Sequence, residues 1–481
     1  MLSLSYVYHA LDSFRHVFSR RRTWALFCVA LLAFIGAREV MGVSSLCRFW
    51  HMEESGYHAL LHLFHSTAWS AGALMAHWSG FVVEQKAGVF VDGRLVMLGD
   101  HTYGVKDATR MPGVVTLHQD SETQSKPSYF RGHHWGVVGM LIGTLKEAFC
   151  LPLAARIQQG FAHLQPTGVE EEPHETLGVQ LVRLALDFAV RHDLPSTLVL
   201  DAFFSTGPVF TLAASVYSLA IKQPYLHIIT RAKKSYVAYF PAEQSRRKGP
   251  GRPPKYGDKL KLWDVFTRYK REFSKGLCQV YGREELISYK ALNLLWEPLG
   301  RPLRFIFAIS SRGPLVLMCS DLRIHPLTAV SLYCSRVRIE TLFSMLKGLL
   351  GAFFYRFWSK GLPRHSRKPR KSSELKHPRA EDLHSVRGAW EACERFMMLG
   401  CIALGLMQLI AVKFSDRIWG RFARFLRTRS RSLPSERTVR EVLTRELLED
   451  IHGVAPSAAM QQIRAFLDPP PKPAQNEPAV A

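Results

Sequence analysis

The sequence has no pair of cysteines at the C-x-x-C spacing, although it contains eight cysteines. This absence argues against zinc-ribbon and thioredoxin-like sites, which need such pairs. Most of the cysteines stand in apolar runs, as buried thiols do, so a reducing cytoplasm is the simplest compartment.

The apolar run over residues 23–37 is shorter than the about 20 residues of a membrane-spanning helix. It lacks a small-residue cleavage site and a following stop-transfer segment, so we interpret it as a buried helix.

Acidic residues are scarce relative to basic ones: 40 Asp and Glu stand against 63 Lys and Arg, a formal net charge of +23. Such an excess favours a polyanionic partner, either nucleic acid or an anionic membrane surface, and the spread of the basic residues favours nucleic acid. The chain of 481 residues is too long for one ordinary core, and 47% hydrophobic residues fit a soluble globular protein. Two or three domains are therefore expected.

The order of strand and helix patterns predicts an α/β core. We expect a hairpin over residues 88–99 that turns at Asp92-Gly93, and a strand at 135–142 followed by a helical segment. An amphipathic helix at 178–192 precedes short apolar strands. The remaining predicted elements are strands at 196–200, 225–230, 304–310 and 314–320 and a long helix at 328–350. This alternation predicts a central mixed sheet with flanking helices.

The composition also changes along the chain and predicts its domain organisation. A helical, DNA-binding N-terminal region comes first, and the α/β core is interrupted by an insertion that contains a basic, Pro- and Gly-rich loop. A basic linker leads to C-terminal helices and a Pro-rich tail expected to be disordered. The predicted regions are 1–85 (helical), 86–231 with 301–358 (core), 232–300 (insertion), 359–383 (linker), 384–468 (helical) and 469–481 (tail).

Two aspartates follow apolar strands of this core. Asp100 ends the sequence MLGD and Asp201 ends LVLD. Ligand sites of α/β sheets open at the carboxyl ends of strands, which makes both candidates, although either could also be an ordinary cap or turn residue. Asp92 competes with Asp100, but its Asp-Gly context is that of a hairpin turn. Asp107 and Asp321 are weaker alternatives.

The long predicted helix carries chemically related side chains on one face. Tyr333, Arg336, Glu340 and Lys347 are spaced so that they fall within about 60° of one another on a continuous helix. A solvated face with an Arg336–Glu340 ion pair would explain the charges alone. Three carboxylates converging from two strands and a helix, however, would suit two Mg²⁺ ions that activate water and stabilise a leaving oxygen. Nearby Arg and Lys would suit phosphate.

The spacing Y-x2-R-x3-E-x6-K resembles the signature of bacterial insertion-sequence transposases with a ribonuclease-H-like Asp-Asp-Glu core. Asp100 in LGDHTYGVKDATRMPGV and Asp201 in LVLDAFFSTGPV are similar to the two aspartate blocks of that family, and Ser320-Asp321-Leu322 resembles the strand end before its glutamate helix. The resemblance covers about residues 20–350 and, less clearly, the C-terminal helices.

The resemblance implies a ribonuclease-H-like fold with a mostly β insertion between Asp201 and Glu340. It implies that Asp100, Asp201 and Glu340 hold Mg²⁺ or Mn²⁺. In such relatives a Trp of the insertion stacks on a base flipped out as the DNA end forms a hairpin; Trp263 and Trp296 lie there, with core packing as the alternative. The residues that the resemblance places at phosphates are Tyr333, Arg336, Lys347 and Lys106.

A basic loop and a histidine pair complete the candidates. Gly251-Arg252-Pro253 resembles a minor-groove hook, and with Lys255 it is expected to contact DNA, either in an A·T-rich groove or through nonspecific phosphate contacts. The linker at 364–379 is a further phosphate-binding candidate. Adjacent His133 and His134 would point to opposite faces of a strand, so joint metal ligation is not expected.

Together these features predict a cut-and-paste DNA transposase that binds terminal inverted repeats and joins the freed 3′-OH to target DNA. The family implies a homodimer in the DNA complex, and we expect no membrane partner and a cytoplasmic, nucleoid-associated protein. One alternative is a ribonuclease-H-like nuclease without strand transfer. Another is a non-enzymatic protein, either DNA-binding or membrane-associated.

Overall fold

The structure, a computed structural model, describes residues 2–118, 128–166, 174–242, 254–368, 376–423, 425, 429, 431–453 and 456–467. The chain forms two compact units, each built from separate segments. A helical unit contains Met1–Trp78, Met345–Phe357 and Arg387–Ala481, and a sheet unit contains Ser79–Ser344 and Trp358–Val386.

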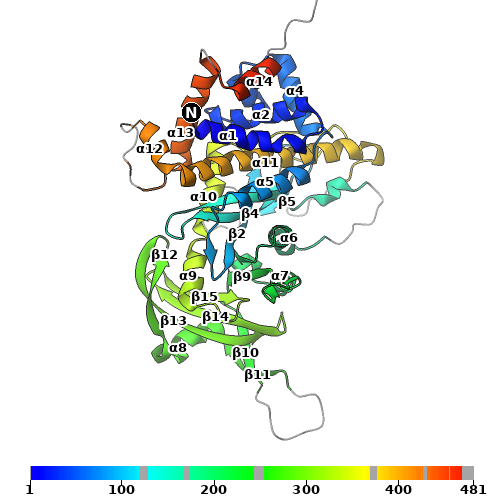
Figure 1. Ribbon diagram of the computed structural model, residues 1–481. Coiled ribbons are helices and arrows are strands. Elements are labelled where there is room, and N and C mark those ends of the chain that lie inside the picture. Colours follow the sequence, from blue (N-terminus) through cyan, green and yellow to red (C-terminus); the bar gives the residue numbers. More distant parts are fainter. Residues whose placement is uncertain are drawn as a thin grey trace, which may run out of the picture. The chain divides into compact units, whose positions relative to one another are not determined.

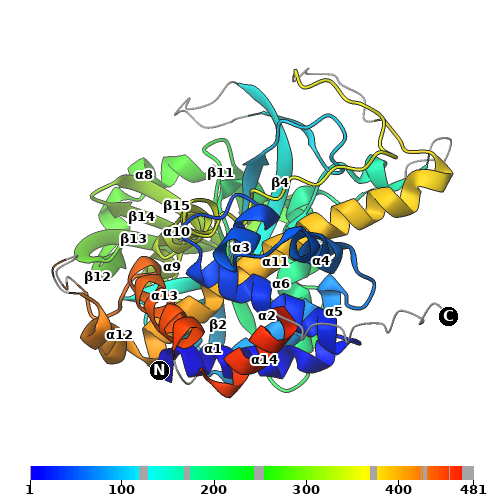
Figure 2. The ribbon, with the colours of Figure 1, turned by 90° about the horizontal axis from the view of Figure 1, so that it is seen from above.

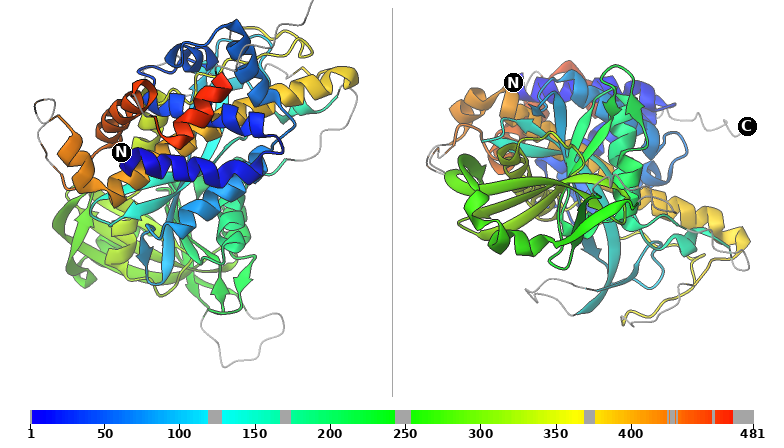
Figure 3. Two further views of the ribbon diagram at one scale, coloured as in Figure 1. Left: turned by 45° about the horizontal axis from the view of Figure 1, so that its top comes forward. Right: turned by 90° about the horizontal axis from the view of Figure 1, so that it is seen from below.

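The helical unit brings distant parts of the chain together, as its blue, orange and red helices show (Figure 3). Its helices are α1 (Leu2–Ser13), α2 (Arg21–Gly36), α3 (Val43–Phe49), α4 (Glu54–His65), α12 (Ser415–Arg421), α13 (Glu436–His452) and α14 (Ala458–Leu467), with 3₁₀ turn η1 (Phe14–Val17) and π turn η6 (Met345–Leu349). Helix α5 (Ala71–Glu84) begins in this unit and α11 (Leu383–Lys413) ends in it.

The predicted buried helix is confirmed as α2. Its residues from Ala25 to Gly36 are buried, and it packs against α3, α4, α13 and α14. Because its apolar side chains point in all directions, only a helix covered on all sides can hold them. In the described part of the chain, one helix, Ala380–Lys413, has the length and composition to cross a membrane, and 89% of its apolar window is buried inside the protein.

The sheet unit is built on a 13-stranded mixed sheet (Figure 1). Its path runs β11-β10-β13-β14-β15-β9-β6-β2-β4-β3, and β1, β12 and β5 pair with β2, β13 and β4. The strands are β1 (Phe90–Val91), β2 (Arg94–Val105), β3 (Val115–His118), β4 (Tyr129–Gly143), β5 (Ala148–Ile157), β6 (Ser196–Val199), β9 (Leu226–Arg231), β10 (Val237–Pro241), β11 (Tyr256–Lys261), β12 (Ser274–Val280), β13 (Arg283–Trp296), β14 (Arg301–Ser310) and β15 (Gly313–Cys319). A separate hairpin pairs β7 (Tyr217–Ser218) with β8 (Gln223–Pro224).

Helices flank the sheet. Helix α6 (Leu177–Arg191) packs on β2, β4 and β9, next to α7 (Gly207–Ala213). Helix α9 (Pro326–Cys334) packs mainly on β12, and α10 (Val337–Ser344) packs on β5 and β2. The shorter elements are α8 (Val265–Arg268) and the 3₁₀ turns η2 (Phe161–Leu164), η3 (Ala202–Phe204), η4 (Leu262–Asp264), η5 (Lys270–Glu272) and η7 (Ala380–Asp382). The prediction of a mixed sheet with flanking helices is confirmed.

Strands β9, β6 and β2 are adjacent and parallel, and their neighbours β15 and β4 are antiparallel to them. All four residues of β6 are buried, as in a central parallel strand. These three strands therefore define two ends of the sheet unit, an amino end and a carboxyl end, with different polar residues at each.

Two predicted elements are wrong. The segment after residue 142 is not helical: it forms strand β5, because a strand buried on both faces is apolar throughout and shows no alternation. The long helix predicted at 328–350 is broken, since α9 ends at Cys334 and α10 begins at Val337. The predicted turn at Asp92-Gly93 is confirmed, with φ of 50° and 73° at its two residues.

Candidate active site

Asp100 and Asp201 stand at the same level on two adjacent parallel strands. Leu98 of β2 pairs with Val199 of β6, and each aspartate lies two residues further along its own strand. Strand β6 ends at Val199, two residues before Asp201, whereas β2 continues past Asp100 to Val105, so the prediction that a strand ends at Asp100 is wrong. The common register nevertheless places both carboxylates at the carboxyl end of the parallel strands.

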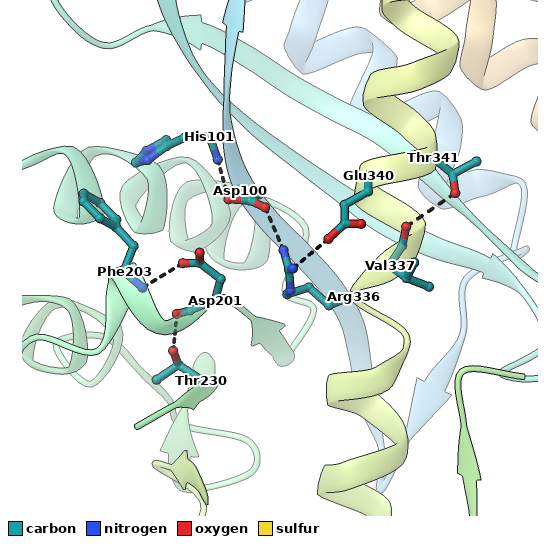
Figure 4. A network of polar contacts seen from close by, with 9 residues as sticks. All are labelled: Asp100, His101, Asp201, Phe203, Thr230, Arg336, Val337, Glu340 and Thr341. Carbon is teal, nitrogen blue, oxygen red and sulfur yellow. Dashed lines mark hydrogen bonds and ion pairs between the residues drawn. The ribbon is translucent and has the colours of Figure 1, made fainter. Parts of the chain in front are cut away.

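Local contacts fix the backbone beside each aspartate. Asp201 Oδ1 accepts a hydrogen bond from the Phe203 amide at 2.8 Å, and the Thr230 hydroxyl donates to the Asp201 carbonyl (Figure 4). A Cβ at Gly99 would lie 2.6 Å from Leu181 Cδ2 and 2.9 Å from Leu200 Cδ2. Glycine therefore lets α6 pack tightly on β2 just before Asp100.

Arg336 joins the third carboxylate to this pair. Its Nη1 lies 2.7 Å from Asp100 Oδ2 and its Nη2 lies 2.8 Å from Glu340 Oε1 (Figure 4). The guanidinium thus stands between a carboxylate of the sheet and a carboxylate of α10. Arg336 lies in the break between α9 and α10, and the i,i+4 contact with Glu340 survives that break.

The site is short of positive charge. Burial, with the neighbouring Asp201 carboxylate as the second cause, raises the pKa of Asp100 to about 7. Burial also raises the pKa of Asp201. Burial lowers the pKa of Arg336, but attraction by Asp100, Tyr333, Glu340 and Asp201 outweighs it and the net shift is upward. One arginine therefore does not neutralise three carboxylates, and a further cation would be bound favourably here.

The residues suit a divalent cation in kind. Carboxylate oxygens are the ligands that Mg²⁺ prefers, and a bound cation would offset the burial and the Asp201 repulsion that together raise the pKa of Asp100. Among the described residues, no group of three or more His, Cys, Asp or Glu is gathered closely enough to hold an ion. In this arrangement the guanidinium of Arg336 supplies the positive charge between the carboxylates of Asp100 and Glu340.

The residues predicted at phosphates lie in different surroundings. Tyr333 is buried at the end of α9, where burial raises its pKa to about 12. Lys106 is also buried, one residue past β2, with its amide bonded to the Arg131 carbonyl. Lys347 belongs to the helical unit, where its Nζ lies 5.3 Å from the ring centroid of Phe353.

The two tryptophans of the predicted insertion also differ. Trp296 is 3% exposed, packs against Phe210 and Tyr236, and lines a cavity of about 370 Å³. Trp263 is half-buried and packs on Phe266, with 5.5 Å between ring centroids. The cavity begins four residues after Asp201; its other lining residues are Ser205, Thr206, Gly207, Ser235, Tyr236, Val237, Glu297 and Pro298.

The basic loop is only partly described. Lys255 is exposed near the ring of Tyr256, at 5.7 Å from Nζ to the centroid. Arg252 lies outside the described residues, and so does the rest of the predicted minor-groove hook. His133 and His134 have separate partners: His133 Nε2 bonds the Pro112 carbonyl, and the His134 ring contacts His101.

The alternative aspartates lie away from Asp100 and Asp201. Asp92 occupies the turn before β2, at the amino end of the sheet. Asp321 follows β15, which runs antiparallel to β9. The Ser320 hydroxyl oxygen accepts a hydrogen bond from the Ile228 amide near the start of β9, so Asp321 also lies at the amino end. Asp107 is exposed and lies 3.6 Å from Arg367.

Sequence reasoning missed a cationic segment beside the acids. Arg231 ends β9 and Lys233 follows it, as Asp201 follows β6. Burial raises the pKa of both Asp201 and Tyr333; charge attraction by Lys233 offsets part of the rise for Asp201, and attraction by Arg231 offsets part of it for Tyr333. The signal was the sequence RAKK directly after a predicted strand.

Acidic side chains collected at the carboxyl end of a mixed sheet define a site of the kind that metal-assisted phosphodiester cleavage uses. The chain belongs to the DDE superfamily of endonucleases, because the family model of that description matches residues 13–272, more than half of its length. The matched region contains Asp100 and Asp201 and ends before Glu340. The chain is thus an endonuclease of a family that acts on DNA and generally uses divalent metal. No curated protein matches the chain.

Proposed function

We propose that this protein is a DNA transposase that cleaves the ends of its own element and joins the 3′-OH to target DNA. The observation that carries the proposal is the bridge from Asp100 through Arg336 to Glu340, with Asp201 in register beside Asp100. The family supports DNA cleavage, and the Y-R-E-K spacing supports an insertion-sequence transposase with a ribonuclease-H-like core.

In this proposal Asp100, Asp201 and Glu340 hold Mg²⁺ or Mn²⁺. When bound, the metal supplies an activated water or 3′-OH and stabilises the charge on the leaving oxygen. Arg336 keeps Asp100 and Glu340 together in the absence of DNA, and its planar fork suits a phosphate once DNA is bound. Tyr333, Lys106 and Lys347 are proposed as further phosphate contacts.

The cavity lined by Trp296 supports a second element of the proposal. Its volume of about 370 Å³ and its aromatic edges suit an unpaired base, so Trp296 is a better candidate for base contact than Trp263. The low exposure of Trp296 means that a base would meet the ring edge or Tyr236 beside it. Base flipping would accompany a hairpin intermediate. A homodimer that holds two DNA ends, and a location at the nucleoid, belong to the same proposal.

The test combines cleavage and joining. Purified protein is incubated with duplex DNA of the element's end, a target plasmid and Mg²⁺, and the nicked and joined products are separated. We expect both products from the wild-type chain and neither from Glu340→Gln, which keeps size and hydrogen bonding but removes the charge. Full cleavage by Glu340→Gln would refute the site. Cleavage without joining would identify a nuclease without strand transfer, and no cleavage by the folded wild-type chain would favour a non-enzymatic protein.

A further inference from the structure

Residues 358–368, here named the basic strap, are tied to the sheet unit beyond the end of β2. The Ser359 amide donates to the Arg110 carbonyl at 3.0 Å, and Arg110 Nη1 donates to the Lys360 carbonyl at 2.9 Å. The His365 amide donates to the Thr109 carbonyl at 2.7 Å. The strap therefore has a defined path, in yellow beside the cyan region of β4 (Figure 2).

Buried histidines hold the far end of the strap. His163 Nδ1 accepts from the Gly113 amide at 2.9 Å, so the proton of a neutral His163 ring is on Nε2. That Nε2 lies 3.4 Å from His365 Nε2, which also accepts from the Lys376 amide at 3.1 Å. A continuous set of hydrogen bonds thus fixes His365 on the sheet unit. Leu362, fully buried between the two anchors, adds apolar contact.

The outward side of the strap is basic and carries one large aromatic ring. Trp358 is 58% exposed although Ser359 beside it is buried and anchored. The only acidic side chain paired with the strap among the described residues is that of Asp107, at 3.6 Å from Arg367, and both are well exposed. The exposed basic residues are Lys360, Arg364, Arg367 and Lys368. The strap therefore presents four cations and an indole from a backbone that is already ordered.

The strap lies on the same side of the sheet unit as the acids. Thr109 and Arg110, which hold it, follow the carboxyl end of β2, and Val105 is five residues beyond Asp100. Five residues of strand span about 17 Å. That length equals about five base pairs of duplex DNA. A duplex cut at the acids could therefore reach the strap within one helical turn.

We propose that the basic strap is a DNA-binding surface in which the four cations contact phosphates and Trp358 stacks on an unpaired base. The inference rests on the proposed function in one respect, namely that DNA is the substrate. Cations alone would fit any polyanion, but an exposed indole on an anchored backbone among them provides a stacking platform for a base. Its position on the carboxylate side favours DNA over an anionic lipid surface.

Equilibrium binding of the full chain, without divalent cation, tests the surface. The probes are a duplex, the same duplex with a short single-stranded gap, and vesicles of phosphatidylglycerol and phosphatidylcholine, each over a series of salt concentrations. The variant Arg364→Gln/Arg367→Gln/Lys368→Gln is expected to reduce the slope of log K against log salt for DNA by about 2.7, since each lost phosphate contact removes about 0.9. The matched control is Lys146→Gln/Arg191→Gln/Lys222→Gln, which removes three exposed cations, in the β4–β5 turn, at the end of α6 and in the β7–β8 turn.

The tryptophan is tested separately. Trp358→Ala is expected to weaken binding to the gapped duplex by roughly 5- to 150-fold with little change for the intact duplex, and Trp358→Phe is expected to restore most of the loss. The proposal would be overturned if the strap variant and the control variant lost DNA affinity equally, or if the strap variant left the salt slope of DNA binding unchanged. It would also be overturned if a folded Trp358→Ala variant bound the gapped duplex as tightly as the wild-type chain. Lost vesicle binding with retained DNA binding would overturn it in favour of a lipid surface. Cleavage and joining are measured independently, so a strap that fails leaves the catalytic proposal standing, and the reverse also holds.

Discussion

The two ends of the parallel strands β9, β6 and β2 each hold a partly or fully buried arginine, and the two arginines have different partners. At the amino end, Arg94 is buried and donates to the carbonyls of Ser196, Pro224 and Tyr225 and to the side chain of Gln223. At the carboxyl end, Arg336 contacts two carboxylates in a group of three.

The two arginines show two uses of the same side chain: Arg94 stabilises the fold, whereas Arg336 belongs to a charged site. Arg94 donates to neutral backbone and amide acceptors, and burial lowers its pKa to about 10. Asp321 and Arg323 also act on Arg94 by charge, in opposite directions. At the other end the acids outnumber Arg336, and the pKa of Asp100 is raised to about 7. A site with surplus negative charge can bind a cation, whereas a site whose hydrogen bonds are complete mainly stabilises the fold.

We expect the largest effect on the rate of DNA cleavage, when an aspartate at one end of the parallel strands is compared with an aspartate at the other end. Asp201→Asn removes one carboxylate from the acidic site and is expected to reduce DNA cleavage at least about 1,000-fold, since a bound metal contributes several kcal/mol to the transition state. Asp321→Asn, at the amino end, is expected to change the rate less than about threefold. Single-turnover cleavage of a labelled duplex measures both. A large loss with Asp321→Asn would erase the distinction between the ends.

The next effect compares the two arginines by stability. Arg94→Met removes the hydrogen bonds that Arg94 donates to the carbonyls of Ser196, Pro224 and Tyr225 and is expected to destabilise the sheet unit by about 3 kcal/mol. Arg336→Met leaves the exposed Glu340 to water and leaves Asp100 free to take up a proton, because its pKa is already about 7, so the substitution is expected to cost less than about 1 kcal/mol. Thermal and urea unfolding measure the difference. The comparison is wrong if Arg336→Met proves the more destabilising substitution.

The smallest expected effect is on how stability changes with pH, because of buried histidines near the carboxyl end of the parallel strands. Burial is the main reason why the pKa values of His101, His133 and His163 fall to about 3. An unfolded histidine takes up a proton near pH 6.5, so each of these groups lowers stability as the pH falls from 6.5 towards 3, by about 2 kcal/mol at pH 5. Asp100, with its raised pKa, acts in the opposite direction between pH 7 and 3.8.

His133→Gln isolates this contribution. The variant is expected to lose less stability than the wild-type chain between pH 6.5 and 5, by about 2 kcal/mol. Unfolding midpoints at several pH values measure how steeply stability changes with pH, and this slope does not depend on the absolute stability of the variant. Parallel slopes for the two proteins would show that His133 is not held neutral by burial.

Much of the acidic site follows from local sequence. The Asp-Gly turn fixes the start of β2, and a short apolar strand fixes Asp201, because both patterns act over a few residues. The break at Ser335 was not predictable in the same way, since neither Pro nor Gly interrupts the helix there. The docking of the basic strap depends on His163 and His365, which are 202 residues apart. Contacts of that kind depend on the tertiary fold and leave no periodic signal.

The helical unit draws its helices from both ends of the chain, and this has a consequence for synthesis. Helix α2 packs against α13 and α14, which begin about 400 residues later. At about 5–20 residues per second, a ribosome needs roughly 20–80 s to supply them. Asp100, Asp201 and Glu340 are all translated before that time has passed. The nascent chain therefore completes its acidic residues while α2 still lacks the cover of α13 and α14, which makes α2 the segment that we expect chaperones to bind first.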